Sequence, residues 1–318
     1  MLVALVGLTA WVVTARDSTA HTPARSVAAV TTPAVAVTTP AGTTPTRSTA
    51  SASTTSTGSA TPAAIASTST TAVAPTTSES TALTRLHSLA SAYPTSATSV
   101  AAVNLDTGAA ADVGATSGMT TASVVKLQLL ETLLLEHQAS GTTLTDAEDD
   151  AATAMIEHSD NDAAESVFWY DGGRATIVSH EAALGLSTTL TVPGSDDYWG
   201  LTTTSAAQQL VLLHDLVDSG SPLDAKSRAY ALGLMREVEA DQAWGVSAAA
   251  DHGTDTALKN GWLGVDDDGG RWAVNSVGVV TVDGDTLLIA VMTQHDDDYA
   301  SGVSRVETLA RAAAAAVT

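Results

Sequence analysis

The apolar pattern changes period twice along this chain, and that change limits the folds it can adopt. From residue 81 the pattern predicts a short amphipathic helix and then two strands joined by an Asp-Thr-Gly turn. From residue 123 to about 238 the period is helical, and after residue 256 strand patterns return. Strands on both sides of a helical stretch predict one antiparallel sheet built from both ends of the domain, with a helical subdomain inserted.

The predicted elements follow from these periods. Helices are expected near 81–93, 123–138, 146–157, 161–170, 173–185, 203–219, 223–239 and 301–316. Strands are expected at 99–108, 110–116, 256–265, 271–282 and 286–294, with Gly269-Gly270 as a hairpin turn. We therefore predict a mixed α/β (α+β) fold over residues 81–318, with the natural site in a cleft between the sheet and the helical subdomain.

The first 80 residues have a different composition. The run "MLVALVGLTAWVV" is 13 residues long, too short to cross a bilayer, and within residues 1–16 it fits a signal peptide or the end of a membrane anchor. Residues 17–80 are almost entirely Thr, Ala, Ser, Pro and Val, which predicts a disordered linker. We therefore expect an extracellular or cell-envelope protein, secreted or attached to a membrane through its N-terminal segment only.

Charge and composition exclude several classes of partner and cofactor. Residues 81–318 contain 33 acidic and 10 basic side chains, so they lack the basic surface that nucleic acids or anionic lipids require. These 318 residues contain no cysteine, and the eight histidines show no metal-binding spacing. We expect a monomer without a metal or other cofactor.

Ser123 and Lys126 lie three residues apart in "ASVVKLQLL". This spacing places both side chains on one helix face, and the surrounding apolar residues indicate a buried helix. Burial lowers the pKa of a lysine toward values useful to a base, whereas arginine stays charged. The alternative is a helix-capping serine with a lysine that reaches solvent.

Two further motifs carry polar groups. "HSDND" contains Ser159 and Asn161 at a helix junction, where a hydroxyl can relay a proton and an amide can bind a substrate amide, although both residue types also cap helices. "LKNGW" places Lys259 and Gly261 on one face of a strand, where Lys259 can bind an anionic group and Gly261 leaves room for a substrate backbone. The alternative for "LKNGW" is an edge-strand lysine and a bend-forming glycine.

In this order the three motifs resemble S-x-x-K, S-D-N and K-T-G of the penicillin-recognising serine hydrolases, in particular the class A β-lactamase branch and the exported β-lactamase-related serine hydrolases of actinobacteria. The resemblance covers nearly all of residues 82–318, including "YWGLTTTSAAQQLVLL". It implies a β-lactamase/transpeptidase-like fold and a β-lactam or peptidoglycan stem peptide as the ligand.

The resemblance also assigns roles to individual residues. It implies that Ser123 is acylated, that Lys126 is its base, and that Ser159 passes a proton to the leaving nitrogen. The remaining groups would bind substrate: Asn161 its side-chain amide, Lys259 and Asn260 its carboxylate, Gly261 its backbone, and the backbone N–H groups of Ser123 and Trp262 its oxyanion.

The chain departs from the family pattern in two places. Asn260 stands where the family has Thr or Ser, so the motif lacks a hydroxyl. The stretch that matches the omega loop, "STTLTVPGSDDYWGL", contains no Glu, and its carboxylates are Asp196 and Asp197. Because class A enzymes clear the acyl group with a Glu in this loop, we expect slow deacylation.

Two hypotheses remain open on the sequence alone. The first is an exported serine hydrolase that forms an acyl-enzyme with β-lactams or cell-wall D-Ala-type peptides. The second is a catalytically weak envelope protein that uses the same cleft to bind peptidoglycan or a protein partner. We favour the first, because a binding protein has little need for a lysine beside a serine on a buried helix.

Overall fold

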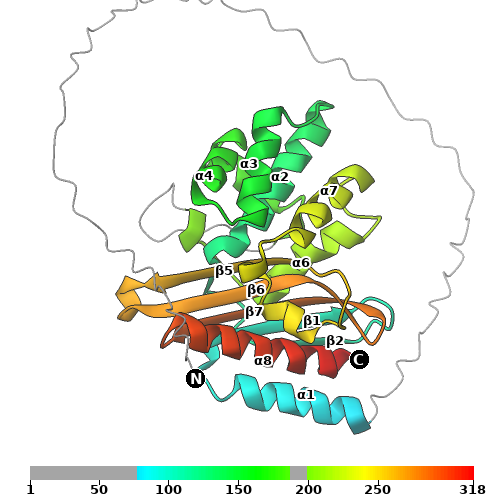
Figure 1. The fold of residues 1–318 in the computed structure, drawn as a ribbon, viewed down its shortest axis with the longest axis vertical. Helices are drawn as coiled ribbons and strands as arrows, with labels where there is room; N and C mark the ends of the chain where they lie inside the picture. Colours follow the sequence, from blue (N-terminus) through cyan, green and yellow to red (C-terminus); the bar gives the residue numbers. More distant parts are fainter. Residues whose placement is uncertain (1–76, 187–198) are drawn as a thin grey trace, which may run out of the picture. The chain divides into compact units, whose positions relative to one another are not determined.

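Five strands form one antiparallel sheet in a computed structural model that describes residues 77–186 and 199–318 (Figure 1). The order across the sheet is β2-β1-β7-β6-β5. The strands are β1 (Thr98–Asn104), β2 (Ala110–Gly114), β5 (Ala257–Val265), β6 (Arg271–Val282) and β7 (Asp285–Asp296). A second, two-stranded pairing joins β3 (Met119–Thr120) to β4 (Thr203–Thr204). The predicted fold class, a sheet assembled from both ends of the domain, is confirmed.

Helices cover both faces of the large sheet (Figure 1). One face is covered by α1 (Thr77–Ala90) and α8 (Tyr299–Val317). On the other side lie α2 (Val125–Ser140), α3 (Asp146–Glu157), α4 (Asn161–Tyr170), α5 (Arg174–Glu181), α6 (Ala206–Val217) and α7 (Ala225–Arg236). Short 3-10 turns are η1 (Thr95–Ala97), η2 (Ala122–Val124), η3 (Trp199–Leu201), η4 (Ala240–Gln242), η5 (Gly245–Ala249) and η6 (Asp266–Asp268).

Strand β7 separates two apolar cores, which explains its continuous apolar sequence. Leu288, Ala290 and Met292 face the core shared with the inserted helices. Leu287, Ile289 and Val291 alternate with them and face the core under α1 and α8. Because successive strand residues point to opposite faces, a strand buried on both sides must be apolar at every position.

Most element boundaries lie within a few residues of those predicted. The helix expected from residue 203 begins at Ala206, because Thr203 and Thr204 pair with β3 and the Ser205 side chain accepts the first capping bond, from Gln208 N. Gly269 and Gly270 both adopt positive φ, at 70° and 80°, in the turn between β5 and β6.

Several sequence predictions concern residues outside the described ranges. They are the apolar segment 1–16, the predicted linker up to residue 76 and the two aspartates Asp196 and Asp197. None of the helices that the structure describes combines the length and the apolar character needed to cross a bilayer.

Arg305 connects α8 to the sheet through a buried ion pair. Its guanidinium lies 2.8 Å from Asp296 Oδ1, and it also donates to Ala97 O at 2.8 Å and to Thr98 Oγ1. Thr293 Oγ1 donates to the second oxygen of Asp296 at 2.7 Å. Both oxygens of Asp296 and both terminal nitrogens of Arg305 therefore have partners within the fold, whereas the buried Arg305 Nε has none among the described residues.

We expect Arg305→Met to lower the free energy of unfolding by about 3–5 kcal/mol, because it leaves the Asp296 carboxylate buried without its partner. Urea unfolding followed by circular dichroism measures this change. Arg311→Met is the matched control on the same helix. Arg311 pairs with Glu307 at 3.3 Å and donates to Ala248 O at 3.1 Å, both on the surface, and its loss should cost less than about 1 kcal/mol. Equal effects of the two changes would contradict this account.

Gly261 on β5 permits a close approach between the sheet and the turn before α2. A Cβ atom at this position would lie 2.7 Å from the backbone nitrogens of both Ser123 and Val124. Its cross-strand neighbour Asn275 faces the same side and donates through Nδ2 to Thr121 O at 3.0 Å. The turn is therefore seated on β5 and held by β6.

Gly261→Ala should destabilise the protein by about 1–3 kcal/mol. The added Cβ would press β5 against the turn at Ser123, and neither backbone can move without breaking hydrogen bonds of the sheet or the turn. Gly264→Ala on the same strand is the control, since its added Cβ would meet only the Trp272 ring, at 3.7 Å, and the Gly270 carbonyl, at 3.9 Å. Thermal and urea unfolding of both variants measure the difference. If Gly261→Ala were as stable as Gly264→Ala, the close approach would not constrain the fold.

Candidate active site

Ser123 lies in the 3-10 turn η2, half-buried, and this turn leads directly into the buried helix α2. The preceding residue, Ala122, has a φ of 46°, a conformation that non-glycine residues rarely adopt. Thr121 N donates to Thr202 O at 2.9 Å, which ties the start of the turn to the segment before α6. The turn is thus held from two sides, by this bond and by β6, and the serine has a defined position.

Lys126 reaches the junction between α3 and α4. Its side chain is 0% exposed, and its Nζ donates to Ser159 O at 2.6 Å, to Asn161 Oδ1 at 2.9 Å and to Ser159 Oγ at 3.3 Å. Burial lowers the pKa of Lys126 to about 7, while the Asp160 carboxylate opposes the shift. A substantial fraction of this amine is therefore neutral near pH 7, as a general base requires.

The α3–α4 junction turns Ser159 toward both lysines. Ser159 has a φ of 55°, in the left-handed region, between the end of α3 and the N-cap of α4. Asp160 is that cap, and its Oδ1 accepts from Ala163 N at 2.7 Å. With Asp160 capping the helix, the side chains on either side of it, Ser159 and Asn161, contact Lys126.

Lys259 approaches the same hydroxyl from the sheet. Its side chain is 0% exposed, and its Nζ donates to Ser159 Oγ at 2.9 Å and to Asn260 O at 3.0 Å. Burial lowers the pKa of Lys259 well below its usual value, and the positive charge of Lys126 lowers it further. An anionic group bound beside Lys259 would oppose both effects and favour its charged form.

The Ser159 hydroxyl thus stands between two buried amines. A hydroxyl has one proton to donate and two lone pairs, so it can accept from a charged lysine while donating to a neutral one. This arrangement allows a proton to pass between Lys126 and Lys259 through Ser159. Ser123 lies in the turn that leads into the helix of Lys126, and Gly261 of β5 lies against its backbone nitrogen.

Asn260 is placed differently from the prediction. Its side chain is 1% exposed, and its Nδ2 donates to Gln242 O at 2.7 Å and to Trp244 O at 3.0 Å. Asn260 alternates with Lys259 and Gly261 along β5, so it faces the opposite side of the sheet. The expectation that this amide binds a substrate carboxylate is therefore corrected: it holds the segment around η4 and η5 against β5.

Gly261 and Trp262 also differ in their placement. Gly261 lies against the backbone of Ser123 and Val124, so its missing side chain makes room for the protein's own turn. Trp262 packs its ring against Trp244 and Tyr299, with centroid distances of 5.9 and 5.8 Å. The role of the Trp262 N–H in an oxyanion hole remains a prediction.

Trp199 and Glu165 join the site although the sequence did not identify them. The Trp199 ring centroid lies 5.2 Å from Lys126 Nζ, and its Nε1 donates to Glu165 Oε2 at 3.0 Å. Trp169 Nε1 donates to the other oxygen, Oε1, at 2.7 Å. Glu165 follows Asn161 by one helical turn, which is a signal in the sequence, but the contact with Trp199 depends on the tertiary fold.

Taken together, the described groups suit acyl transfer. A serine at a helix start, a lysine with a lowered pKa, a bridging hydroxyl and a second amine are the components of nucleophilic catalysis with proton relay. Within residues 77–186 and 199–318, no cluster of three or more His, Asp or Glu side chains could hold a metal ion.

Solved structures share the fold of this chain. The chain is similar to PBP-A, solved as a mutant in an acyl-enzyme complex with penicillin G, with a TM-score of 0.62 and 22% identity over 73% of this chain and 94% of that one. It is also similar to the TLA-3 extended-spectrum β-lactamase, with a TM-score of 0.64 and 14% identity over 74% and 97% of the two chains. A class A β-lactamase from Mycobacterium abscessus gives a TM-score of 0.58 and 18% identity over 73% and 97%.

Sequence comparison extends the relationship to mycobacterial proteins. The chain is 30% identical over 207 residues to "Putative lipoprotein LppW" of Mycobacterium bovis and of Mycobacterium tuberculosis, which covers 63% of this chain and 64% of those relatives. The model of the family described as "Beta-lactamase enzyme family" matches residues 135–317, which include Ser159, Asn161 and Lys259 and begin after Ser123 and Lys126. Because this match covers more than half of the chain, the protein belongs to the β-lactamase enzyme family.

Proposed function

We propose that this protein is an exported serine hydrolase that forms an acyl-enzyme on Ser123 with β-lactams or cell-wall D-Ala-type peptides. The observation that carries the proposal is the convergence of two fully buried lysines on one hydroxyl, with Nζ–Oγ distances of 3.3 Å from Lys126 and 2.9 Å from Lys259. Burying two amines is costly, and chemistry that uses their lowered pKa values accounts for that cost.

The proposed reaction begins at Lys126. Its neutral amine accepts the Ser123 Oγ proton as that oxygen attacks the substrate carbonyl, and the N–H groups of Ser123 and Trp262 stabilise the oxyanion. The proton passes from Lys126 through Ser159 to the leaving nitrogen, which breaks the amide bond and leaves the acyl group on Ser123. Lys259 pairs with the substrate carboxylate, and Asn161 binds a substrate amide.

We expect the acyl group to leave slowly. Glu165 is a nearby carboxylate: it binds Trp199, and the ring of Trp199 contacts Lys126. Both of its oxygens, however, accept hydrogen bonds from tryptophan N–H groups, at 2.7 and 3.0 Å. A carboxylate held in this way is less available to activate a water. Asp196 and Asp197 lie outside the described residues.

A binding role for the same site is the second candidate. The burial of Asn260 on the far side of the sheet supports it. Of the side chains in the third motif, only the Lys259 amine then remains to bind a substrate carboxylate. In that case the protein would bind peptidoglycan or a protein partner through the groups around Ser159 without turnover.

The cell envelope is the proposed location. The mycobacterial relatives carry the description "Putative lipoprotein LppW", and this supports an envelope position for the present chain. No cysteine occurs in these 318 residues, so attachment through them would use the apolar segment 1–16 instead of a lipidated cysteine.

A fluorescent penicillin should label the purified protein on Ser123, with an increase in intact mass equal to that of the whole reagent. Ser123→Ala should abolish labelling, whereas Ser140→Ala, at the other end of α2, should label at the parent rate. Because deacylation is expected to be slow, the adduct should persist after excess reagent is removed. Absence of a Ser123-dependent adduct, together with no hydrolysis of a chromogenic cephalosporin or of activated esters, would exclude the enzyme and favour the binding role.

The acylation rate should rise with pH and level off above about pH 8. Lys126 acts as a base only when neutral, and its pKa of about 7 means that the neutral fraction falls roughly tenfold for each pH unit below that value. Single-turnover acylation between about pH 5.5 and about pH 8.5 measures this profile.

Lys126→Arg is the corresponding variant, since arginine keeps the charge and cannot act as the base. It should slow acylation by at least about 10²-fold while circular dichroism remains unchanged. A flat pH profile in the parent protein, or an undiminished rate in the folded variant, would refute the assignment of Lys126 as the base.

A further inference from the structure

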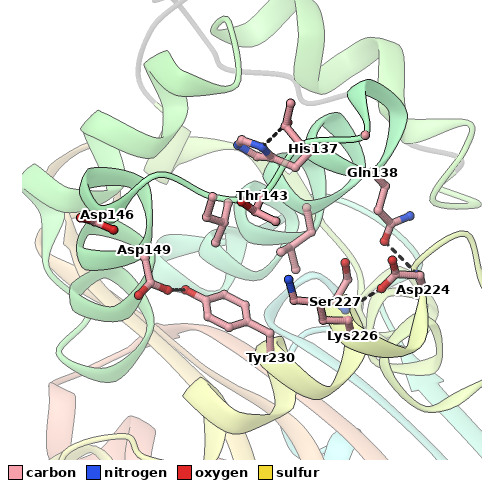
Figure 2. Close-up of a pocket in the computed structure, with 13 residues that line it drawn as sticks. His137, Gln138, Thr143, Asp146, Asp149, Asp224, Lys226, Ser227 and Tyr230 are labelled. Atoms are coloured by element: carbon pink, nitrogen blue, oxygen red, sulfur yellow. Dashed lines mark hydrogen bonds between the residues drawn. The ribbon is translucent and has the colours of Figure 1, made fainter.

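A pocket lies at the C-terminal end of α2, around His137 and Gln138 (Figure 2). Its volume is about 500 Å³, within the range of small-molecule sites. The C-terminal part of α2, the connection to α3, the first turn of α3 and the N-terminal half of α7 form its walls. None of the groups assigned to acyl transfer lines it, so it is a separate site.

Hydrogen bonds between the walls hold this pocket in shape. Gln138 at the end of α2 accepts from Asp224 N at 2.8 Å through Oε1 and donates to Pro222 O at 3.0 Å through Nε2. Across the pocket, Tyr230 donates its hydroxyl to Asp149 Oδ1 at 2.6 Å, which joins α7 to α3. A ligand would therefore enter a site that is already formed and would not have to order it.

Two exposed charged groups of the pocket have no hydrogen-bonded partner in the described part of the chain. Neither the Lys226 ammonium nor the Asp146 carboxylate forms a hydrogen bond or salt bridge with a described residue. The Ser227 N–H and the nearby Lys226 charge both lower the pKa of the Asp224 carboxyl. Figure 2 shows Asp146 and Asp149 at one end of the pocket and Lys226 at the other, with the Tyr230 ring between them. Lys226 is one of only three lysines in the chain, and the other two lie in the proposed acyl-transfer site.

Apolar and polar side chains share the remaining surface, and together with the charged groups they limit the ligands that fit. Leu134, which is buried, Leu144 and the Tyr230 ring contribute to the walls. The three aspartates of the pocket, Asp146, Asp149 and Asp224, disfavour an anion, and the Lys226 ammonium disfavours a ligand with two positive charges. A molecule with one charge of each sign and an apolar part satisfies both conditions.

We propose that this pocket binds a zwitterionic ligand of amino-acid or short-peptide chemistry. The ligand carboxylate pairs with Lys226, its ammonium group pairs with Asp146, and its apolar side chain lies against Leu134 and Tyr230. This binding needs no acylation of Ser123, so the proposal stands apart from the proposed function.

Nuclear magnetic resonance of the ¹⁵N-labelled full chain tests the proposal with four probes: L-leucine, L-leucyl-L-alanine, N-acetyl-L-leucine and L-leucinamide. The two unblocked probes should produce saturable shifts in residues 137–146 and 224–230. N-acetyl-L-leucine lacks the ammonium and L-leucinamide lacks the carboxylate, so each should bind roughly tenfold more weakly than L-leucine.

Variants assign the two charges. Lys226→Met and Asp146→Asn should each weaken binding of the unblocked probes by roughly tenfold. The matched controls remove the same charges outside the pocket: Arg236→Met on the same helix as Lys226, and Asp162→Asn in the first turn of α4. Both controls should bind like the parent, and signals distant from the pocket report that every variant is folded.

Three results would overturn the proposal. They are no saturable shift with either unblocked probe, equal affinity for the blocked and unblocked leucines, and equal affinity in Lys226→Met and Arg236→Met.

Discussion

Two buried amines that meet at one hydroxyl are the constraint on which the rest of this structure depends. Lys126 and Lys259 are both fully buried, and both contact Ser159 Oγ. The low dielectric of that position disfavours two full charges, so the pKa values of both lysines fall and protons become transferable. Holding three groups from distant parts of the chain in this geometry requires a rigid frame around them.

The frame consists of a sheet with an apolar core on each face. Strand β7 contributes alternate side chains to both cores, so neither core can shift without the other. On this sheet Gly261 lets the turn before α2 approach β5, and Asn275 fixes that turn from β6. At the α3–α4 junction, Asp160 caps α4 and Ser159 adopts a left-handed backbone conformation. In this conformation the Ser159 hydroxyl contacts both lysines.

Predictions from the sequence succeeded where a signal is local. Helical and strand periods predicted the order of elements from α1 to α8. The motifs, through the family that they resemble, predicted a common site, and the structure brings Lys126 and Lys259 together at Ser159. The family relationship that these motifs indicated agrees with the matching family model and the similar folds. Glu165 and Trp199 were missed because their contact joins α4 to a turn more than thirty residues later, and residue spacing carries no such information.

By itself, the sequence determined the class of fold and the family, because burial patterns and short motifs are properties of neighbouring residues. Only the tertiary structure decided which way each side chain of the third motif points. Because successive strand residues point to opposite faces, Asn260 points away from Lys259 and toward the face of the sheet that α1 and α8 cover. The pocket at the far end of α2 is also a tertiary result, because its lining comes from residues 134–149 and 224–230, which meet only when the helices pack.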